Sequence, residues 1–320
     1  MSFEKPENFQ PYTLSPEDAK AMRPLTEEER KELGVGEKIE KKSRPEMSVS
    51  RLSTVFQNPE NLQEQTIEIN LEEILKEQGQ FYKNNLNLDI NEINESAVRE
   101  IWNRNYAEIQ KEIETYGYDS ILIIPNDLPE EEILNRDLVE TMDEGAGKGK
   151  VAATYQGDNF KNDGKSFAGV KNTYSPKYRL VLTHSDQNIY KNTAANPFLK
   201  ATLGKNIMGL TGLAPKEVQK RIDNGQELPV NFETEFKGQK IQIQAEGLSL
   251  EEYQVLQRMY FEKNKKHLDE SGWSWLSKSF SGSRVVLSSW LPGVRRLVVD
   301  ADDPGDADDN LGLRLSRSFS

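Results

Sequence analysis

Cysteine is absent from the 320-residue sequence, and histidine occurs only twice. The absence of cysteine excludes a disulfide framework, a thiolate metal site and a cysteine nucleophile. Neither His184 nor His267 has a partner at a spacing typical of a catalytic triad. We therefore expect no catalytic residue and predict that the chain is not an enzyme.

Positive charge and long apolar runs are also scarce. The sequence has 53 acidic and 41 basic residues, a net charge of −12. Binding to nucleic-acid phosphates or anionic lipid needs clustered positive charge. No apolar run is long enough to span a bilayer, and the first residues lack the apolar core of a signal peptide. We expect no nucleic-acid or membrane partner and a cytoplasmic location.

Composition and periodicity divide the chain into three parts. Residues 1–58 are polar and poor in large apolar residues, which predicts a flexible arm. Residues 59–227 mix helical and strand patterns and are either separate from the last part or continuous with it. Residues 228–320 form the last part, so the fold class predicted for the whole chain is α+β.

Individual elements follow from spacing and capping residues. Asn70 is expected to cap a short helix, and a longer helix with an apolar face from Val98 through Tyr106 to Ile113 should end near Gly117. Ser249 and Glu252 form a capping-box pattern for a helix over 249–265 that buries one face. Other expected elements are a strand at 120–124, a helix at 130–142, strands at 151–155 and 178–183, a helical segment at 196–224 broken at Pro197, Gly204 and Gly209, and a hairpin at 230–245 turning at Gly238.

The last fifty residues differ from the rest of the chain. They hold three of the four tryptophans, and Trp273 and Trp275 are predicted to share a buried face. Leu297, Val299 and Ala301 alternate with other residues at a period of two, which predicts a strand that turns these three into the core. The remaining positions mix apolar, hydroxyl and acidic side chains and are predicted to form an exposed contact face: Leu287, Ser289, Leu291, Val298, Asp300 and Asp302.

The C-terminal segment contains, in order, WSWL, SGSR, Trp290 before Pro292, an aspartate-rich turn and a closing LGLRLSRSF. This order resembles the variable proteins of diversity-generating retroelements. The resemblance is strong over 273–320 and moderate back to about Leu248. It implies a C-terminal C-type-lectin-like domain preceded by a mainly helical, mixed region. This framework is shared with formylglycine-generating enzymes, which rely on active-site cysteines that this chain lacks. The resemblance thus implies a non-enzymatic display protein that binds a protein or another macromolecular ligand through its C-terminal face.

In that family, selected positions are mutagenised at adenines of a template copy. The resemblance implies that Asp residues here arise from Asn codons by single A-to-G changes. Arg284, Arg314 and Arg317 match the fixed frame and are expected to pair with buried carbonyls or carboxylates. The positions implied to vary and to bind ligand are Leu287, Ser289, Leu291, Val294, Val298, Asp300, Asp302, Asp306 and Asp308.

Calcium is the alternative explanation of the aspartate run. The segment 300–309 carries six carboxylates in ten residues, and alternate carboxylates are typical of calcium loops. An EF-hand is excluded, because Pro304 and Leu311 occupy ligand positions. A calcium-dependent lectin or metal-stabilised binding protein would use Asp300, Asp302, Asp306 and Asp308. No nucleotide cofactor is expected, because Asn159 stands where a P-loop ending in Lys165-Ser166 requires glycine. Assembly through the N-terminal region is a third hypothesis; the ligand and the oligomeric state stay open.

Overall fold

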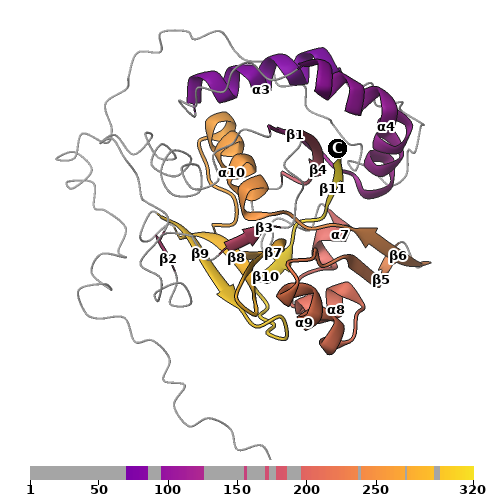
Figure 1. Ribbon diagram of the computed structural model, residues 1–320, viewed down its shortest axis with the longest axis vertical. Coiled ribbons are helices and arrows are strands. Elements are labelled where there is room, and N and C mark those ends of the chain that lie inside the picture. The colour runs from indigo at the N-terminus through magenta and orange to yellow at the C-terminus, as the bar shows by residue number, and fades with distance from the viewer. Residues whose placement is uncertain are drawn as a thin grey trace, which may run out of the picture. The chain divides into compact units, whose positions relative to one another are not determined.

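Figure 1 shows the computed structural model of the chain. All described residues belong to one compact unit, residues 46–320. The predicted arm at 1–58 and the predicted helix at 130–142 lie outside the described residues. The structure describes residues 70–85, 95–125, 155–156, 170–172, 178–185, 196–236, 239–270, 272–291 and 296–320.

Two helices open the described part. Helix α3 (Leu71–Asn85) begins after Asn70, whose side-chain oxygen accepts hydrogen bonds from the next backbone N–H groups, as predicted. Helix α4 (Glu95–Tyr116) ends at Gly117, where φ is 66°. Its apolar face is buried except for Tyr106, which is 37 % exposed. Tyr106 lies at the margin of the apolar stripe, which accounts for its exposure.

A three-stranded antiparallel sheet joins distant parts of the chain. Its order is β1 (Ser120–Ile124), β4 (Arg179–Thr183) and β11 (Ser316–Phe319), so β4 is central and completely buried. The strands predicted at 120–124 and 178–183 are confirmed. Helix α3 lies against β1, and α4 contacts β4 and β11. Residues from before and after position 227 therefore build one sheet.

The second sheet is built mainly from the C-terminal segment. Leu297, Val299 and Ala301 are completely buried, as predicted, and so is Trp275, while Trp273 is partly buried against the core. The predicted strand at 151–155 is described only at its last residue. The strand order is β10 (Leu311–Leu313), β7 (Trp273–Ser281), β8 (Arg284–Leu291), β9 (Arg296–Asp302) and β2 (Tyr155–Gln156), with β3 (Val170–Asn172) also paired to β7.

Short helices and a hairpin lie beside this sheet. The segment predicted as a broken helix forms α7 (Pro197–Lys200), α8 (Ile207–Thr211) and α9 (Pro215–Asp223). Pro197 opens α7, and the breaks fall at Gly204 and Gly212 rather than at Gly209, which is inside α8. Gly212 has φ of 64°, and a Cβ there would lie 2.6 Å from the Asn231 carbonyl oxygen. The predicted hairpin is β5 (Val230–Phe236) and β6 (Gln239–Ala245), and its turn at Gly238 lies outside the described residues.

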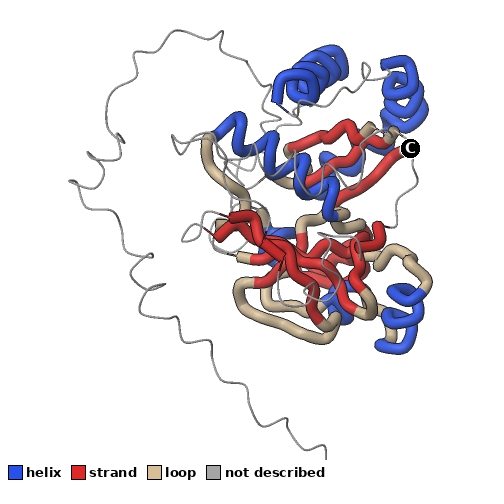
Figure 2. Tube along the Cα trace, turned by 60° about the vertical axis from the view of Figure 1, so that its left-hand side comes forward, coloured by secondary structure: helices blue, strands red, loops and turns tan. Residues whose placement is uncertain are grey.

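Helix α10 (Leu250–Asn264) begins with the predicted capping box of Ser249 and Glu252. It contacts β1 of the first sheet and β7 and β8 of the second (Figure 2). All nine residues from Leu250 to Arg258 are buried, so the helix is enclosed on more than the one face predicted. Contact with two sheets accounts for the difference.

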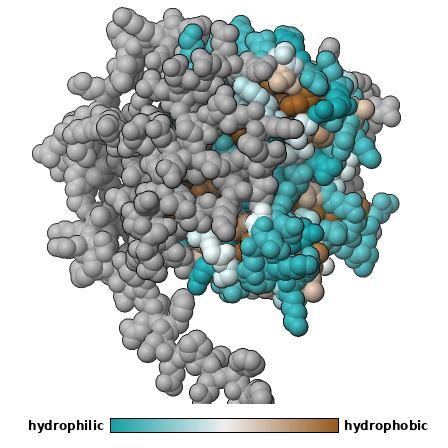
Figure 3. Space-filling view, in the orientation of Figure 1, coloured by the Kyte–Doolittle hydropathy of each residue, from teal (hydrophilic) through white to brown (hydrophobic). Residues whose placement is uncertain are grey.

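On the face shown in Figure 3, the described residues at the surface are mainly hydrophilic. Tyr106 and Leu291 are the exposed large hydrophobic residues of the described part. In the residues that the structure describes, no helix is long and apolar enough to cross a membrane. The mixture of helices and largely antiparallel sheets confirms the α+β class.

Candidate functional site

Strands β8 and β9 bring six of the nine predicted ligand-binding positions onto one face. Leu287 lies opposite Asp300, and Ser289 lies opposite Val298. Directly opposite residues of an antiparallel pair point to the same side of the sheet. Leu291 and Asp302 continue this face by alternation. We call these six residues the ladder face.

The centre of the ladder face is buried, which contradicts the prediction of full exposure. Leu287, Ser289 and Val298 are 6 %, 1 % and 4 % exposed. Leu291 is 36 % exposed and Asp300 is partly exposed. The burial has a physical reason: other parts of the chain pack over this face, as the hydrogen bond from Ser289 to Asp269, outside the sheet, shows.

Specific contacts hold the buried members of the ladder face. The Ser289 hydroxyl donates a hydrogen bond to the Asp269 carbonyl oxygen at 3.1 Å. Leu287 lies opposite Trp275 of β7, and Val298 lies opposite Tyr155 of β2. These three positions therefore contribute to packing as well as to the face.

Two of the remaining predicted positions, Asp306 and Asp308, lie in the turn after β9 and are exposed. Asp302, at the end of β9, is partly exposed. Val294 lies outside the described residues. The accessible part of the predicted site is therefore Leu291, Asp300 and this turn, residues 302–310.

Aspartate side chains shape the turn through bonds to nearby backbone groups. The Asp302 carboxylate accepts a hydrogen bond from the Asp303 N–H at 3.0 Å, and Asp303 accepts from Gly305 at 2.7 Å. Asp308 accepts from the Asn310 N–H at 3.1 Å. Such Asx contacts are made equally well by asparagine. The turn geometry would therefore survive exchange between the two residue types.

Helix α8 and the residues before it fix the turn from outside. The Met208 N–H donates to the Pro304 carbonyl oxygen at 3.3 Å, and the Asn206 amide donates to the Gly305 carbonyl oxygen at 3.1 Å. Asn206 also caps α8 by accepting from the Gly209 N–H at 2.7 Å. A single residue thus positions both the helix and the turn.

Two carboxyl groups of the turn interact directly. Partial burial, together with hydrogen bonding to Asp302, raises the pKa of Asp306 above its ordinary value. Arg284 lies 3.6 Å from an Asp302 oxygen and offsets part of the charge. The turn is an acidic surface with one cation at its edge.

The calcium alternative lacks the geometry it needs. Among the described residues, which include all four proposed ligands, no group of three or more carboxylates or imidazoles is placed to hold a metal ion. A calcium site requires six to eight oxygen ligands around one point. The structure therefore does not gather Asp300, Asp302, Asp306 and Asp308 into the predicted alternative site.

A buried ion pair supports the sheet beneath the site. Arg314 donates to both carboxylate oxygens of Asp269, at 2.7 and 3.2 Å, and both side chains are nearly inaccessible. Asp269 also accepts hydrogen bonds from the Tyr253 hydroxyl at 2.9 Å and the Ser274 hydroxyl at 2.7 Å. Arg314 further donates to the His184 carbonyl oxygen at 3.0 Å. The expected pairing of Arg314 with buried acceptors is confirmed.

The other two frame arginines pair on the surface. Arg284 donates to the Ala301 carbonyl oxygen at 3.3 Å. Arg317 contacts Glu108 at 3.1 Å and Glu246 at 3.7 Å. The Arg284 and Arg317 side chains are 45 % and 36 % exposed, so these contacts contribute less than the buried Arg314 pair.

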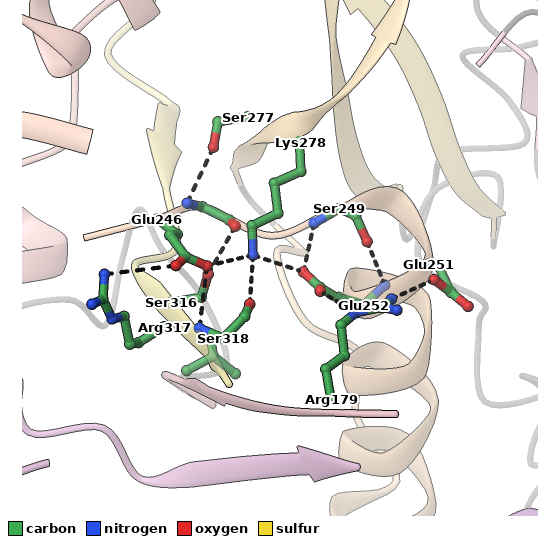
Figure 4. A network of polar contacts seen from close by, with 12 residues as sticks. Arg179, Glu246, Ser249, Glu251, Glu252, Ser277, Lys278, Ser316, Arg317 and Ser318 are labelled. Carbon is green, nitrogen blue, oxygen red and sulfur yellow. Dashed lines mark hydrogen bonds and ion pairs between the residues drawn. The ribbon is translucent and has the colours of Figure 1, made fainter. Parts of the chain in front are cut away.

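Sequence reasoning missed a second charged network, at the junction of the two sheets (Figure 4). The Lys278 ammonium lies 2.7 Å from Glu246, 2.7 Å from the Ser318 hydroxyl and 3.6 Å from Glu252. Arg179 of β4 contacts Glu252 at 3.0 Å and Glu251 at 2.7 Å. We call this set the junction network. A lysine inside the largely uncharged strand 273–281 was the signal that could have revealed it.

The junction network fixes the ionisation of its members. Although burial opposes ionisation, Lys278 and Arg179 hold the pKa of Glu252 below its ordinary value. Burial likewise opposes the charge on Lys278, but Glu252 and Glu246 raise its pKa. Lys278 is therefore a protonated structural cation, unsuited to act as a nucleophile.

Both histidines are buried and neutral. Burial and the nearby Arg314 lower the pKa of His184 to about 3. Burial and Arg258 lower the pKa of His267 to about 3. The His267 ring stacks between Phe261 and Trp290, with centroid distances of 4.5 and 3.4 Å. Neither imidazole is poised to exchange a proton near neutral pH.

Comparisons with family models, with curated proteins and with solved structures each found no match for the chain.

Proposed function

We propose that the chain is a non-enzymatic ligand-binding protein whose C-terminal face is diversified by a retroelement, and that its C-terminal part has a C-type-lectin-like fold. The observation that carries the proposal is the register of β8 and β9. Six of the nine positions implied to vary share one side of that ladder. Two more lie in the turn that follows.

The alternation separates recognition from folding. The residues between the ladder-face positions point to the opposite side of the sheet, where Leu297, Val299 and Ala301 are completely buried. Changes at the exposed positions, Leu291, Asp300 and the turn, therefore leave these core residues in place. This separation is what a diversified binding surface requires.

The accessible positions define the contact surface that we propose. Leu291, Asp300, Asp302, Asp306 and Asp308 combine one exposed apolar side chain with four carboxylates. A complementary partner is a protein with a small apolar patch beside basic groups. Leu287, Ser289 and Val298 lie on the same side of the sheet but are buried, and they hold the strands that carry the surface.

Two features support binding rather than catalysis: a rigid frame, and histidines that are buried and neutral. The Arg314–Asp269 pair and the junction network tie the C-terminal strands to α10 and to the first sheet. Rigid placement lowers the entropy cost of binding. The two imidazoles, each with a pKa of about 3, are poor general bases at neutral pH. A cytoplasmic location remains part of the proposal.

The decisive test is the DNA around the gene. We expect a near-copy of the codons for residues 284–320, accompanied by a reverse-transcriptase gene, with differences confined to adenines of the copy. The mismatched codons should include those of the nine named positions. A complete genome without such a copy would refute diversification and leave only the fold proposal to test.

A display experiment tests the separation of the two faces. One library randomises Leu291, Asp300, Asp302, Asp306 and Asp308. The matched control library randomises five opposite-face positions of the same strands, Val286, Ser288, Leu297, Val299 and Ala301. We expect most members of the first library to bind a conformation-specific reagent and few members of the second to do so. Equal survival would contradict the assignment of the faces.

Salt dependence tests the acidic character of the surface. A protein partner that binds the wild-type chain is selected first. Its rate of association with the chain should fall as ionic strength rises, because screening weakens steering by the four carboxylates. Replacing Asp306 and Asp308 with Asn should flatten that dependence. If the association rate did not change with salt, the apolar contact alone would be the basis of recognition.

A further inference from the structure

The turn at 302–310 has a notch at Gly305. This residue is exposed and has no side chain. A Cβ atom at this position would lie 3.1 Å from the Asp303 Oδ1 atom and 3.6 Å from the Met208 Cε atom. A carboxylate oxygen and an apolar methyl group therefore border the space that a side chain at position 305 would fill. We call this space the Gly305 notch.

Hydrogen bonds to the main chain of the turn fix the walls of the notch. The Met208 N–H donates to the Pro304 carbonyl oxygen at 3.3 Å, and the Asn206 amide donates to the Gly305 carbonyl oxygen at 3.1 Å. The Gly305 N–H donates to the Asp303 carboxylate at 2.7 Å. The notch is thus formed before a ligand arrives, which lowers the entropy cost of binding.

Met208 supplies the apolar wall. Its side chain packs against the hydrophobic core but stays partly exposed. A thioether adapts to apolar groups of different shape. The wall is only one side chain wide, so apolar contact alone would hold a ligand weakly.

Negative charge lies beside this apolar wall. Asp303, Asp306 and Asp308 are exposed. Within the described part of the chain, none of these three forms an ion pair with a lysine or an arginine, whereas Asp302 pairs with Arg284. A ligand group that enters the notch therefore meets an apolar surface and carboxylates together.

We propose that the Gly305 notch binds a lysine or arginine side chain of the protein partner. The methylene stem of that side chain lies on Met208, and its cationic head pairs with Asp303. Long basic side chains commonly cover apolar surface with the stem and keep the head in polar contact. A purely apolar side chain satisfies only the wall, and a short cation satisfies only the carboxylate.

This inference rests on the proposed function and adds a constant element to the contact surface. Met208, Asp303 and Gly305 are not among the nine positions implied to vary. The notch is therefore the same in every diversified form of the chain, whereas residues 306 and 308 change. The partners of such forms share one feature, an exposed basic side chain.

Methyl NMR of the full-length chain, labelled at the methionine methyl groups, tests the chemistry of the notch. The chain has six methionines, and Met208→Leu identifies the signal of Met208. The probes are three capped peptides, Gly-Gly-Xaa-Gly-Gly, in which Xaa is lysine, norleucine or diaminopropionate. Norleucine keeps the stem without the charge, and diaminopropionate keeps the charge with almost no stem.

We expect the lysine peptide to shift the Met208 signal and to bind about fivefold or more tightly than either other peptide. The signal of Met259, on α10, is the internal control and should not move. Equal binding of the diaminopropionate peptide would reduce the interaction to charge and overturn the proposal. A Met208 signal that no peptide shifts would overturn it as well.

Two variants test the notch at constant net charge. Gly305→Ala fills the space and keeps every carboxylate, and the backbone at Gly305 is outside the left-handed region that would disfavour alanine. Met208→Gln keeps the length and helix propensity of the side chain but makes the wall polar. Titrations that follow the lysine signals of the peptide should show about fivefold weaker binding to each variant. If Gly305→Ala does not fold, Met208→Gln decides, and wild-type affinity in a folded variant would make the proposal wrong.

The notch and the proposed function fail separately. If the lysine peptide binds the notch but the gene has no template copy, diversification is refuted and the notch stands. If a selected protein partner depends on Asp306 and Asp308 but binds Gly305→Ala as tightly as the wild type, the contact surface stands and the notch is refuted.

Discussion

At the scale of single residues, Asp269 connects more of the C-terminal frame than any position singled out by sequence. It lies after α10 with φ of 54°, and its carboxylate accepts from Tyr253, Ser274 and Arg314. Its carbonyl oxygen accepts from the Ser289 hydroxyl and the Trp290 N–H. One buried acidic residue thus links α10, β7, β8 and the closing segment.

Replacing Asp269 with Asn isolates the charge of this residue. Asparagine has a similar size and tolerates positive φ, so the backbone conformation should persist. Arg314 would then be buried without a counter-charge, which costs roughly 3–5 kcal/mol. Urea denaturation should show this loss in the free energy of unfolding. Asp303→Asn, at an exposed position of the turn, is the control and should change stability by less than about 0.5 kcal/mol.

Glu227 gives a residue-scale prediction about pH. Burial and the neighbouring Glu246 and Glu252 raise its pKa from 4.5 to about 7, although Lys278 opposes the shift. The folded chain then holds a proton that the unfolded chain releases between about pH 4.5 and pH 7. The contribution of Glu227 to stability is therefore lost as pH rises through this window, by roughly 1–3 kcal/mol.

Glu227→Gln should remove this loss of stability at rising pH. We expect the variant and the wild type to have similar stability at pH 4.5 and the variant to be more stable at pH 8. Denaturant unfolding at several pH values measures the difference. Glu235→Gln, at an exposed position of β5, should show no such trend. A Glu227→Gln difference that is constant with pH would contradict the expectation.

At the scale of elements, the junction network determines how the sheets meet. The register of β7 against β8 shifts between Leu276 and Phe280, and Lys278 lies within this irregular stretch. From there its ammonium reaches Ser318 of β11 and Glu252 of α10. A bulge changes the direction of a side chain. The irregularity therefore directs the Lys278 ammonium into the junction network.

Lys278→Met should destabilise the fold strongly. The change keeps the length of the apolar stem but leaves Glu246 and Glu252 without their shared cation. We expect a loss of roughly 3–5 kcal/mol in thermal or urea unfolding, since removing one partner leaves a buried charge uncompensated. Adding Glu246→Gln should recover part of the loss. A double variant as unstable as the single variant would mean that the loss does not come from the unpaired Glu246 charge.

The sequence predicted elements better than it predicted burial. The capping residues Asn70 and Ser249 and the period-two run at Leu297–Ala301 were sufficient to locate two helices and a strand, because these signals are local. The exposure of Leu287, Ser289 and Val298 was predicted wrongly. Local alternation assigns a residue to a face, whereas the neighbours of that face come from β2, β7 and the loop at Asp269, which are distant in sequence.

Local sequence patterns did not predict the partners of the charged residues either. Arg314 was expected to find a buried acceptor, but nothing in its neighbourhood indicated Asp269, which is 45 residues away. Arg179 and Glu252 are 73 residues apart. Ion pairs of this range depend on the arrangement of whole sheets, which spacing along the chain does not specify.

At the scale of the whole molecule, we expect the ligand-contacting turn and the fold to be nearly independent. Asp306→Asn with Asp308→Asn should leave the free energy of unfolding within about 0.5 kcal/mol of wild type, because asparagine preserves the local backbone contacts. Val299→Ala, one layer below, should cost roughly 1–3 kcal/mol through lost burial and a cavity. Urea titrations of the three proteins provide the comparison. Similar losses in both variants would contradict the separation of surface and core.

The first sheet is assembled from three segments that are far apart along the chain. Thr183 of β4 bonds across to Leu315, 132 residues later, and β11 pairs along β4. Loops of this length must close before any of these contacts stabilises the fold, so the folding rate should be limited by long-range pairing. Until β4 docks, the Ile-rich β1 lacks its neighbour on one side. Slow folding at high protein concentration should therefore favour aggregates nucleated by residues 120–124.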